Sequence, residues 1–282
     1  MAIAQNFPAP LSMDSNAISL TDREFKQFQQ LIYDCAGISL SEVKRSLVSG
    51  RLLKRLRHYE MASFSHYLKL LTSNSSEMQV MVDLLTTNET YFFREQAHFD
   101  YLTQIILPQY DKSYPVEIWS AACSTGEEVY TLAMVLAETR GESGDWSITG
   151  TDINSQVLEK AQGGHYPMSH TRGLPTNYLK AYCLKGVRSL ANTFMIAPEL
   201  RAHTKFFQLN LNTTLPDFGL FDVIFLRNVM IYFDIETKRQ VVARLVKKLK
   251  PGGYFIVGHA ETLHGISGPL RQLKPTIYQL PK

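Results

Sequence analysis

Long apolar runs and abundant cysteine are both missing from this sequence of 282 residues. No window approaches 18 uninterrupted apolar residues, so we expect no membrane insertion. The three cysteines, Cys35, Cys123 and Cys183, are widely separated. This spacing argues against a disulfide framework and against a metal site, and it suits a reducing cytoplasm, where we expect the protein to act.

Neither sign of charge predominates, because the formal net charge is only +3. A balance this mild does not require a nucleic-acid partner. The start of the chain lacks a basic segment followed by an apolar core, so we expect no secretory signal there. Pro8, Pro10 and several Ser and Asn residues instead predict a disordered lead-in over residues 1–18.

A glycine-rich phosphate-binding loop is absent, although the strand–turn–helix arrangement that usually carries one is present. Residues 116–120 read as a buried strand, 121–126 as a turn of small residues, and a helix opens at Glu127. Only Gly126 is a glycine, and Glu127 and Glu128 follow it directly. Two acids at a helix N-terminus repel phosphate but suit a cationic or hydroxyl-bearing ligand. S-adenosylmethionine has a sulfonium, an amino group and a ribose without phosphate, which favours a methyltransferase over a dehydrogenase.

From residue 116 onwards strands and helices alternate, which predicts a parallel sheet with helices on its faces. Asp152 ends the second strand, where it is either an N-cap or an acceptor for a ribose diol; after this loop we favour the ribose role. Residues 221–226 form the most apolar strand, which we expect to be central, and Asn228 and Tyr232 then fall at its carboxyl edge. A terminal hairpin over residues 270–280 distinguishes the methyltransferase variant of the Rossmann-like fold.

Residues 163–205 interrupt the alternation with glycines and prolines, which predicts an inserted β-subdomain. Within it, residues 192–196 alternate in the manner of an edge strand. The part of the chain before the sheet is helical instead, with apolar residues at helical spacing between about residues 25 and 85. A break in the helices follows near Pro108.

The second of these helices, residues 41–59, is strongly basic, and Lys44, Arg51 and Arg55 lie close together on it. The stripe is either a solvated face or a docking site for nucleic acid or an acidic protein helix. After the helices, Asn88, Thr90 and Arg94 are interleaved with aromatic residues. This segment is either a capped turn with core aromatics or a linker whose polar side chains point into a pocket.

We therefore predict an α/β protein whose Rossmann-like methyltransferase domain follows a small all-α domain. The expected boundaries are a lead-in over 1–18, the helical domain over 19–87, and a linker helix over the cofactor pocket at 88–108. The methyltransferase domain then spans 109–282 and contains the insertion at about 163–205. Nothing in the sequence requires an oligomer, so we expect a monomer.

Six segments together resemble one known family, the CheR chemotaxis receptor methyltransferases, in order and with matching spacing from about Leu20 onwards. They are Asn88–Arg94, Ser120–Glu128, Thr151–Ile153, Phe221–Phe233, Leu249–Gly253 and Gly258–Glu261. The resemblance implies an enzyme that uses S-adenosylmethionine to methyl-esterify glutamate side chains on the cytoplasmic helices of chemoreceptors, releasing S-adenosylhomocysteine.

The resemblance also implies site residues. Arg94 and Tyr232 match the pair beside the transferred methyl and the substrate carboxylate, and Lys44, Arg51 and Arg55 fall on the receptor-docking helix. In some members the β-subdomain grips a receptor C-terminal pentapeptide through a glycine-rich loop, whereas residues 185–192 here contain one glycine. The cofactor contacts map onto Asn88, Thr90, Arg94, Glu128, Asp152, Asn210, Leu211, Asn228 and Val229.

The chemistry fits these residues. A glutamate with a pKa of about 4.3 is ionised near neutrality, so its attack on a sulfonium methyl needs alignment rather than a general base. His98, His259 and Cys123 are interpreted as packing or capping groups, not metal ligands. Two alternatives stay open: a scaffold or sensor that binds the cofactor without catalysis, and a nucleic-acid amino-methyltransferase. The second lacks support, since neither proline of an Asn-Pro-Pro-Tyr-like segment is present between Asn228 and Tyr232.

Overall fold

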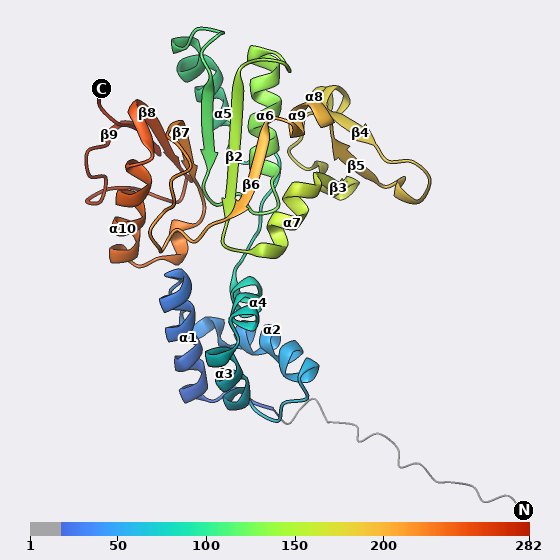
Figure 1. Cartoon of the computed structure of the whole chain (residues 1–282), viewed down its shortest axis with the longest axis vertical. Helices are drawn as coiled ribbons and strands as arrows, with labels where there is room; N and C mark the ends of the chain where they lie inside the picture. The colour runs from blue at the N-terminus through green and yellow to red at the C-terminus, as the bar shows by residue number, and fades with distance from the viewer. Residues whose placement is uncertain (1–17) are drawn as a thin grey trace, which may run out of the picture.

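A computed structural model of the chain describes residues 18–282, which form a helical domain beneath an α/β domain (Figure 1). The predicted lead-in therefore lies outside the described residues, except for its last position. Among residues 18–282, no helix combines the length and the apolar character that a membrane span requires.

The helical domain contains four α-helices around one apolar core. They are α1 (Asp22–Ala36), α2 (Arg45–His58), α3 (Phe64–Ser73) and α4 (Ser75–Leu85), with the short 3-10 helix η1 (Glu42–Lys44) before α2. Thr21 and Glu24 form a capping box at the start of α1, and Gly37 ends it in the left-handed region at φ 71°. Both signals are local, so residues next to each end of the helix determine its bounds.

The α/β domain is built on a seven-stranded sheet in the order β6-β2-β1-β7-β8-β10-β9. Its strands are β1 (Val116–Ser120), β2 (Trp146–Asp152), β6 (Thr204–Gln208), β7 (Phe221–Leu226), β8 (Leu249–Val257), β9 (Arg271–Lys274) and β10 (Ile277–Gln279). The first five are parallel to one another, β10 is antiparallel to β8, and β9 is antiparallel to β10 at the edge of the sheet. β7 is the middle strand and is buried throughout, so the prediction of a central strand is confirmed.

Both faces of this sheet are covered. Ile224 and Leu226 of β7 join the apolar cluster that contains α10 (Ile235–Val246) and extends into the helical domain. Val223 and Phe225 point the other way, into the cluster formed with α6 (Glu127–Arg140) and the linker helices. These linker helices are α5 (Ala97–Tyr101), η2 (Leu102–Ile106) and η3 (Leu107–Gln109), and α7 (Ser155–Gly163) follows β2.

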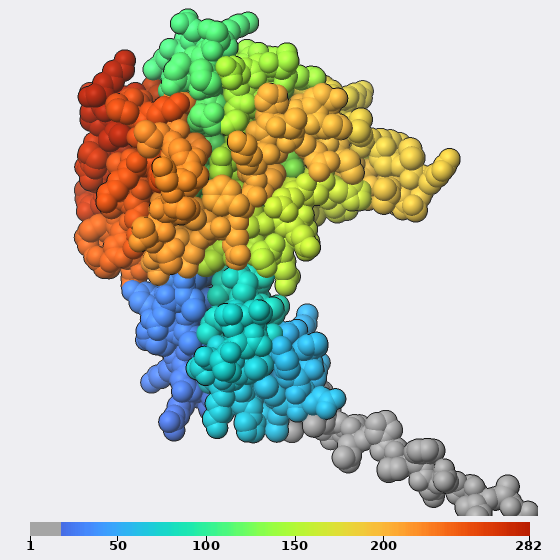
Figure 2. Space-filling model, in the orientation of Figure 1, coloured from blue at the N-terminus to red at the C-terminus, as the bar shows by residue number. Residues whose placement is uncertain are grey.

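The insertion projects to one side of the sheet (Figures 1 and 2). It contains the strands β3 (His165–Pro167), β4 (Cys183–Lys185) and β5 (Thr193–Ile196), and the helices η4 (Met168–Thr171), α8 (Thr176–Tyr182), η5 (Arg188–Leu190) and α9 (Pro198–Arg201). The strand order is β3-β5-β4, so the prediction of an edge strand over residues 192–196 is wrong. Alternation of apolar and polar residues indicates that one face of a strand is buried, and Phe194 and Ile196 are indeed buried. It does not indicate whether the strand pairs with one neighbouring strand or with two.

The segment Lys250–Gly253 contains a proline and two glycines, yet it lies within β8, which begins at Leu249. The pairing of β8 with β7 shifts register between Phe221 and Val223. A bulge of this kind accommodates the extra residues that the proline and glycines supply.

Candidate cofactor and substrate site

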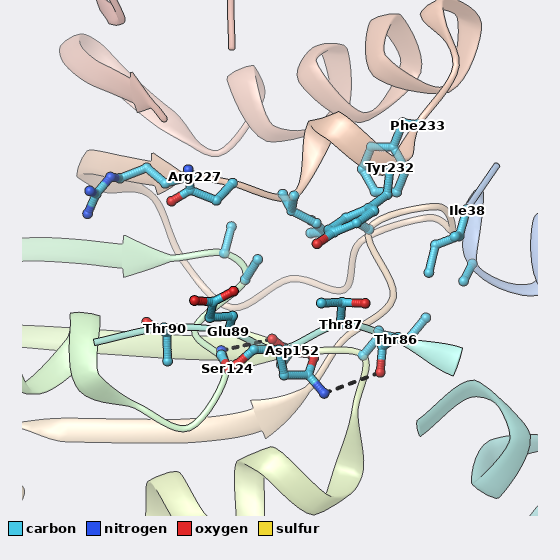
Figure 3. A pocket seen from close by; sticks show the side chains of 18 of the residues that line it. Ile38, Thr86, Thr87, Glu89, Thr90, Ser124, Asp152, Arg227, Tyr232 and Phe233 are labelled. Carbon is cyan, nitrogen blue, oxygen red and sulfur yellow. Dashed lines mark hydrogen bonds between the residues drawn. The ribbon is translucent and has the colours of Figure 1, made fainter. Parts of the chain in front are cut away.

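A pocket of about 1080 Å³, its open mouth included, lies at the carboxyl ends of β1, β2, β6 and β7. The chain segment after α4, residues 86–91, crosses it as a strap, and residues 36–40 between α1 and η1 close it from the helical domain (Figure 3). This size is typical of a small-molecule or cofactor site. All nine residues predicted to contact the cofactor line it, as do Tyr232 and Lys44.

The two acids at the start of α6 have different roles. Glu128 lines the pocket, accepting from the Ser120 hydroxyl at 2.7 Å and pairing with Arg227 Nη1 at 2.7 Å. Glu127 is fully buried on the other side, bonded to the Thr125 hydroxyl at 2.6 Å and close to His170 of the insertion at 3.2 Å. The sequence predicted that both carboxylates face the ligand, whereas Glu128 lines this pocket and Glu127 does not.

Asp152 lies across the pocket from Tyr232, at the end of β2 (Figure 3). Its Oδ2 accepts from the backbone N–H of Ser124 and its Oδ1 from that of Asn154, both at 2.9 Å. The alternative of an N-cap is wrong, because Asn154 caps α7 by accepting from the N–H groups of Gln156 and Val157. Burial raises the pKa of Asp152, although the backbone bonds oppose this shift. Each oxygen retains a lone pair that can accept from a ligand hydroxyl.

Glu261 holds the loop after β7 in place. Its carboxylate accepts from the backbone N–H groups of Gly258, Asn228 and Met230, each at 2.8 Å. Asn228 is in the left-handed region at φ 58°, a conformation that costs free energy unless its surroundings hold it. Sequence reasoning missed Glu261 as a site residue, since only the fold brings this loop under residues 228–232.

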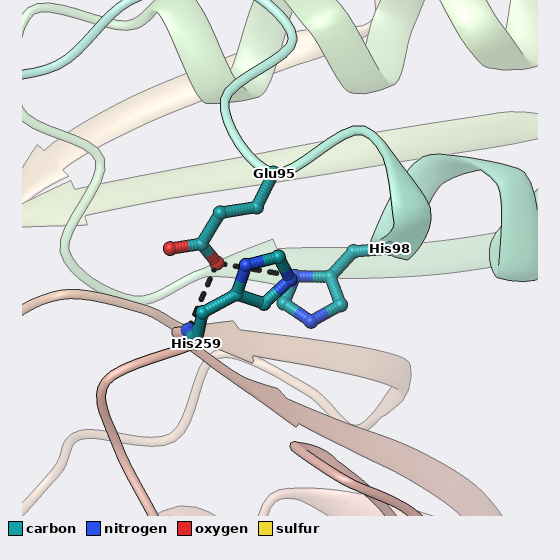
Figure 4. A group of neighbouring side chains, drawn as sticks. All are labelled: Glu95, His98 and His259. Carbon is teal, nitrogen blue, oxygen red and sulfur yellow. Dashed lines mark hydrogen bonds and ion pairs between the residues drawn. The ribbon is translucent and has the colours of Figure 1, made fainter.

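Glu95, His98 and His259 form a hub beside the pocket, in which the Glu95 carboxylate accepts the hydrogen bonds (Figure 4). Glu95 Oε2 accepts from Arg227 Nη2 at 3.0 Å and from the backbone N–H of His259 at 3.1 Å, and Oε1 accepts from Asn228 Nδ2 at 3.1 Å. Burial, followed by the charge of Arg227, lowers the pKa of His98 to about 4. The three side chains are close enough to share an ion, with ligand atoms within 4.8 Å of one another. Both carboxylate oxygens already accept hydrogen bonds, however, so the hub positions Arg227 and Asn228.

Tyr232 and Arg94 line the mouth of the pocket together with Lys44. The Lys44 ammonium lies 5.1 Å from the centre of the Tyr232 ring, and Arg94 Nη1 donates to the Glu89 carbonyl at 2.9 Å. Within residues 18–282 the Tyr232 hydroxyl has no hydrogen-bond partner, so it can donate to a bound carboxylate. The mouth thus offers one hydroxyl and two cations to an anionic substrate.

The other two predicted docking residues have internal partners. Arg55 makes two bonds of 2.7 Å to Glu77, whose side chain is 2% exposed. Arg51 donates to the carbonyls of Leu84 and Thr86 at 2.9 and 2.8 Å. Neither lines the pocket. These hydrogen bonds hold α2 against α4 and against the start of the strap.

The helical domain contributes to the pocket through residues that sequence reasoning missed. Ile38 forms an antiparallel bridge with Phe233, and the Ser39 N–H donates to the Tyr232 carbonyl at 2.8 Å. The strap itself is held by the Ser124 hydroxyl, which donates to the Asn88 carbonyl at 2.8 Å. No local signal in the sequence marks these pairings, because the partners are far apart along the chain.

Comparison with known proteins gives the same division of the chain. The model of the family "CheR methyltransferase, SAM binding domain" matches residues 88–279, and that of "CheR methyltransferase, all-alpha domain" matches residues 23–86. A chemotaxis protein methyltransferase of Escherichia coli K12 is 40% identical over 94% of this chain and 93% of its own length. Chemotaxis protein methyltransferase 2 of Pseudomonas aeruginosa is 37% identical over 96% of this chain and 97% of its own. A chemotaxis protein methyltransferase of Borreliella burgdorferi is 35% identical over 93% and 95%.

Proposed function

The chain belongs to the CheR methyltransferase family, and on that premise we propose that it methyl-esterifies glutamate side chains on the cytoplasmic helices of chemoreceptors. It is an S-adenosylmethionine-dependent methyltransferase with a Rossmann-like catalytic domain. The observation that carries the substrate proposal is that Tyr232, Arg94 and Lys44 line the same pocket as the residues expected to contact the cofactor. A hydroxyl and two cations suit an anionic acceptor better than an amine.

The residues of the pocket fit S-adenosylmethionine. Asp152 has lone pairs for the two ribose hydroxyls, and Glu128 presents a negative charge to the amino group of the methionine part. No glycine-rich cradle for a phosphate is present in the β1–α6 turn, which agrees with a nucleoside that carries none. We propose that the remaining contacts come from Asn88, Thr90, Arg94, Asn210, Leu211, Asn228 and Val229.

When bound, the cofactor supplies an electrophilic methyl group on a sulfonium. The protein's own contribution is then alignment, because the glutamate is already ionised at neutral pH. We propose that the Tyr232 hydroxyl donates to one carboxylate oxygen and that Arg94 orients the same group. Neither residue has to move a proton, so the reaction needs no general base.

We propose that the receptor docks on the helical domain through Lys44, with Arg51 and Arg55 contributing only the exposed edges of their side chains. A receptor C-terminal pentapeptide remains part of the proposal as a tether, because β4 is an edge strand of the inserted sheet and can pair with an extended peptide. We also propose that the enzyme acts as a cytoplasmic monomer with the domain boundaries 19–87, 88–108 and 109–282. Calorimetry with receptor C-terminal peptides tests the tether, and light scattering tests the monomer.

The decisive experiment is transfer of labelled methyl from S-adenosylmethionine to receptor membranes. We expect a labelled product that alkali releases as methanol, because esters hydrolyse in alkali whereas methylamines survive. Label that resists alkali would identify an amino-methyltransferase. Binding of S-adenosylhomocysteine without any transfer would identify a scaffold or sensor.

A further inference from the structure

Two guanidinium groups flank one tyrosine at the rim of the pocket. Arg94 and Arg172 each lie with their Cζ atom 5.8 Å from the centre of the Tyr91 ring. Tyr91 belongs to the strap and lines the pocket, whereas Arg172 comes from the insertion, between η4 and α8. A cation within about 6 Å of an aromatic face is attracted to it, so the ring holds both side chains at the rim.

The turn that carries Arg172 is fixed to the strap. Gly173 adopts φ 80°, and a Cβ atom there would lie 2.3 Å from the Phe92 carbonyl oxygen. Leu174, next in the chain, is buried in the core, and the buried ring of Phe92 packs on Tyr166 and Phe194 of the insertion. The backbone of Arg172 therefore has a defined position, although its side chain is exposed. Among residues 18–282 no carboxylate forms an ion pair with it.

The opposite rim is cationic as well. Lys44 lies over Tyr232, and the apolar side chains of Val43 and Ile231 beside them are 87% and 52% exposed. Among residues 18–282, the acids that line the pocket are Glu89, Glu128 and Asp152; Glu89 is the exposed one, and its backbone carbonyl accepts from Arg94. Lys44 of the helical domain, Arg94 just after the strap and Arg172 of the insertion thus place cations around the proposed entry of the substrate glutamate.

We propose that Arg172 is a substrate-binding residue that recognises a second acidic side chain on the receptor helix, one turn away from the target glutamate. This inference rests on the proposed function. Residues three and four positions apart on a helix project side by side, about 5–6 Å from each other. When one glutamate enters the pocket, an acidic neighbour on the same face therefore reaches the rim, where Arg172 is held.

The test uses two helical fragments of a receptor that lack its C-terminal tail. One carries an acidic residue four positions from the target glutamate, and the other carries glutamine there. The wild-type enzyme should show a KM about 3- to 5-fold lower for the acidic fragment, the range typical of an exposed ion pair. Arg172→Ala should remove this difference, and Arg172→Lys should restore most of it. Lys180→Ala, which removes an exposed cation of α8 in the same insertion, is the matched control and should preserve it.

The outcomes separate this inference from the proposed function. If Arg172→Ala methylates both fragments with the same KM difference as the wild type, Arg172 does not bind the substrate, even though esterification proceeds. If neither fragment is esterified by the wild type, the proposed function itself fails. The dissociation constant for S-adenosylhomocysteine, measured by calorimetry, should be unchanged in every variant; a change in Arg172→Ala would assign the effect to the cofactor pocket instead.

Discussion

At the scale of single residues, the site separates side chains that we propose contact the substrate from side chains that hold other groups in place. Tyr232 and Arg94 face the mouth of the pocket, whereas Arg227 is buried behind them. Arg227 bridges Glu95 and Glu128 at 3.0 and 2.7 Å, and these two half-buried carboxylates balance the charge of the buried guanidinium. Its neighbour Asn228 depends on this arrangement for its unusual backbone conformation.

The role of the Tyr232 hydroxyl can be isolated by one substitution. Tyr232→Phe removes the proposed donor to the substrate carboxylate but keeps the ring that Lys44 contacts. We expect kcat to fall about 10-fold or more, the value of one hydrogen bond to a charged group, with an unchanged dissociation constant for S-adenosylhomocysteine. Single-turnover methylation and calorimetry measure the two quantities. An unchanged kcat would mean that Tyr232 only packs.

Protonation of His98 should make the free energy of unfolding depend on pH, in a direction that the surroundings of this side chain determine. Its pKa falls from 6.5 to about 4 in the folded state because of burial and Arg227. The unfolded chain therefore binds a proton between these pH values that the folded chain does not. The contribution of His98 to the free energy of unfolding should therefore be complete above pH 6.5 and should be lost as the pH falls towards 4. The loss from this group alone should be about 3 kcal/mol.

Urea unfolding at several pH values tests this dependence. The variant His98→Phe loses the bond to Thr276 and should be less stable at pH 7, but its stability should change less between pH 6.5 and 4. Equal slopes for the variant and the wild type would show that other groups cause the acid sensitivity.

At the scale of elements, α2 combines a structural and an exposed face. Arg55→Ala leaves Glu77 buried with only the hydroxyls of Tyr59 and Tyr67, which should cost about 3 kcal/mol of unfolding free energy. Lys44→Ala, by contrast, should change stability by less than about 0.5 kcal/mol and raise the KM for receptor. Denaturant titration and steady-state methylation distinguish them. A large stability loss in Lys44→Ala would make it a structural residue too.

The loop after β7 is the element that Glu261 controls. Glu261→Gln keeps the shape of the side chain but replaces one acceptor oxygen by an amide donor that faces backbone N–H groups. We expect residues 228–233 to exchange amide hydrogens about 10-fold faster or more, since a lost buried bond to a charged group is worth over 1 kcal/mol. Weaker binding of S-adenosylhomocysteine should accompany this change. Wild-type exchange rates in the variant would show that the loop is held by other contacts.

At the scale of the whole molecule, the sequence predicted the parts whose signals are local. The bounds of β1, the start of α6 at Glu127 and the central position of β7 follow from apolar runs and caps. It could not predict that Ile38 pairs with Phe233, because neither residue type specifies a partner almost two hundred positions away. The partners of Arg51 and Arg55 were missed for the same reason: a basic stripe does not reveal which of its charges meet a buried acid.

The junction between the domains completes the cofactor pocket, which yields a last prediction. Asp83 of α4 accepts from the backbone N–H of Ser155 at 3.0 Å and from its hydroxyl at 2.6 Å, just before the chain enters the strap. Asp83→Ala should therefore loosen the strap and weaken S-adenosylhomocysteine binding about 5- to 10-fold, the loss expected for one or two hydrogen bonds to a charged group. Asp34→Ala, an exposed acid of α1, is the control and should bind as the wild type does. Calorimetry measures both. Wild-type affinity in Asp83→Ala would mean that the sheet edge alone holds the cofactor and that the helical domain serves only the receptor.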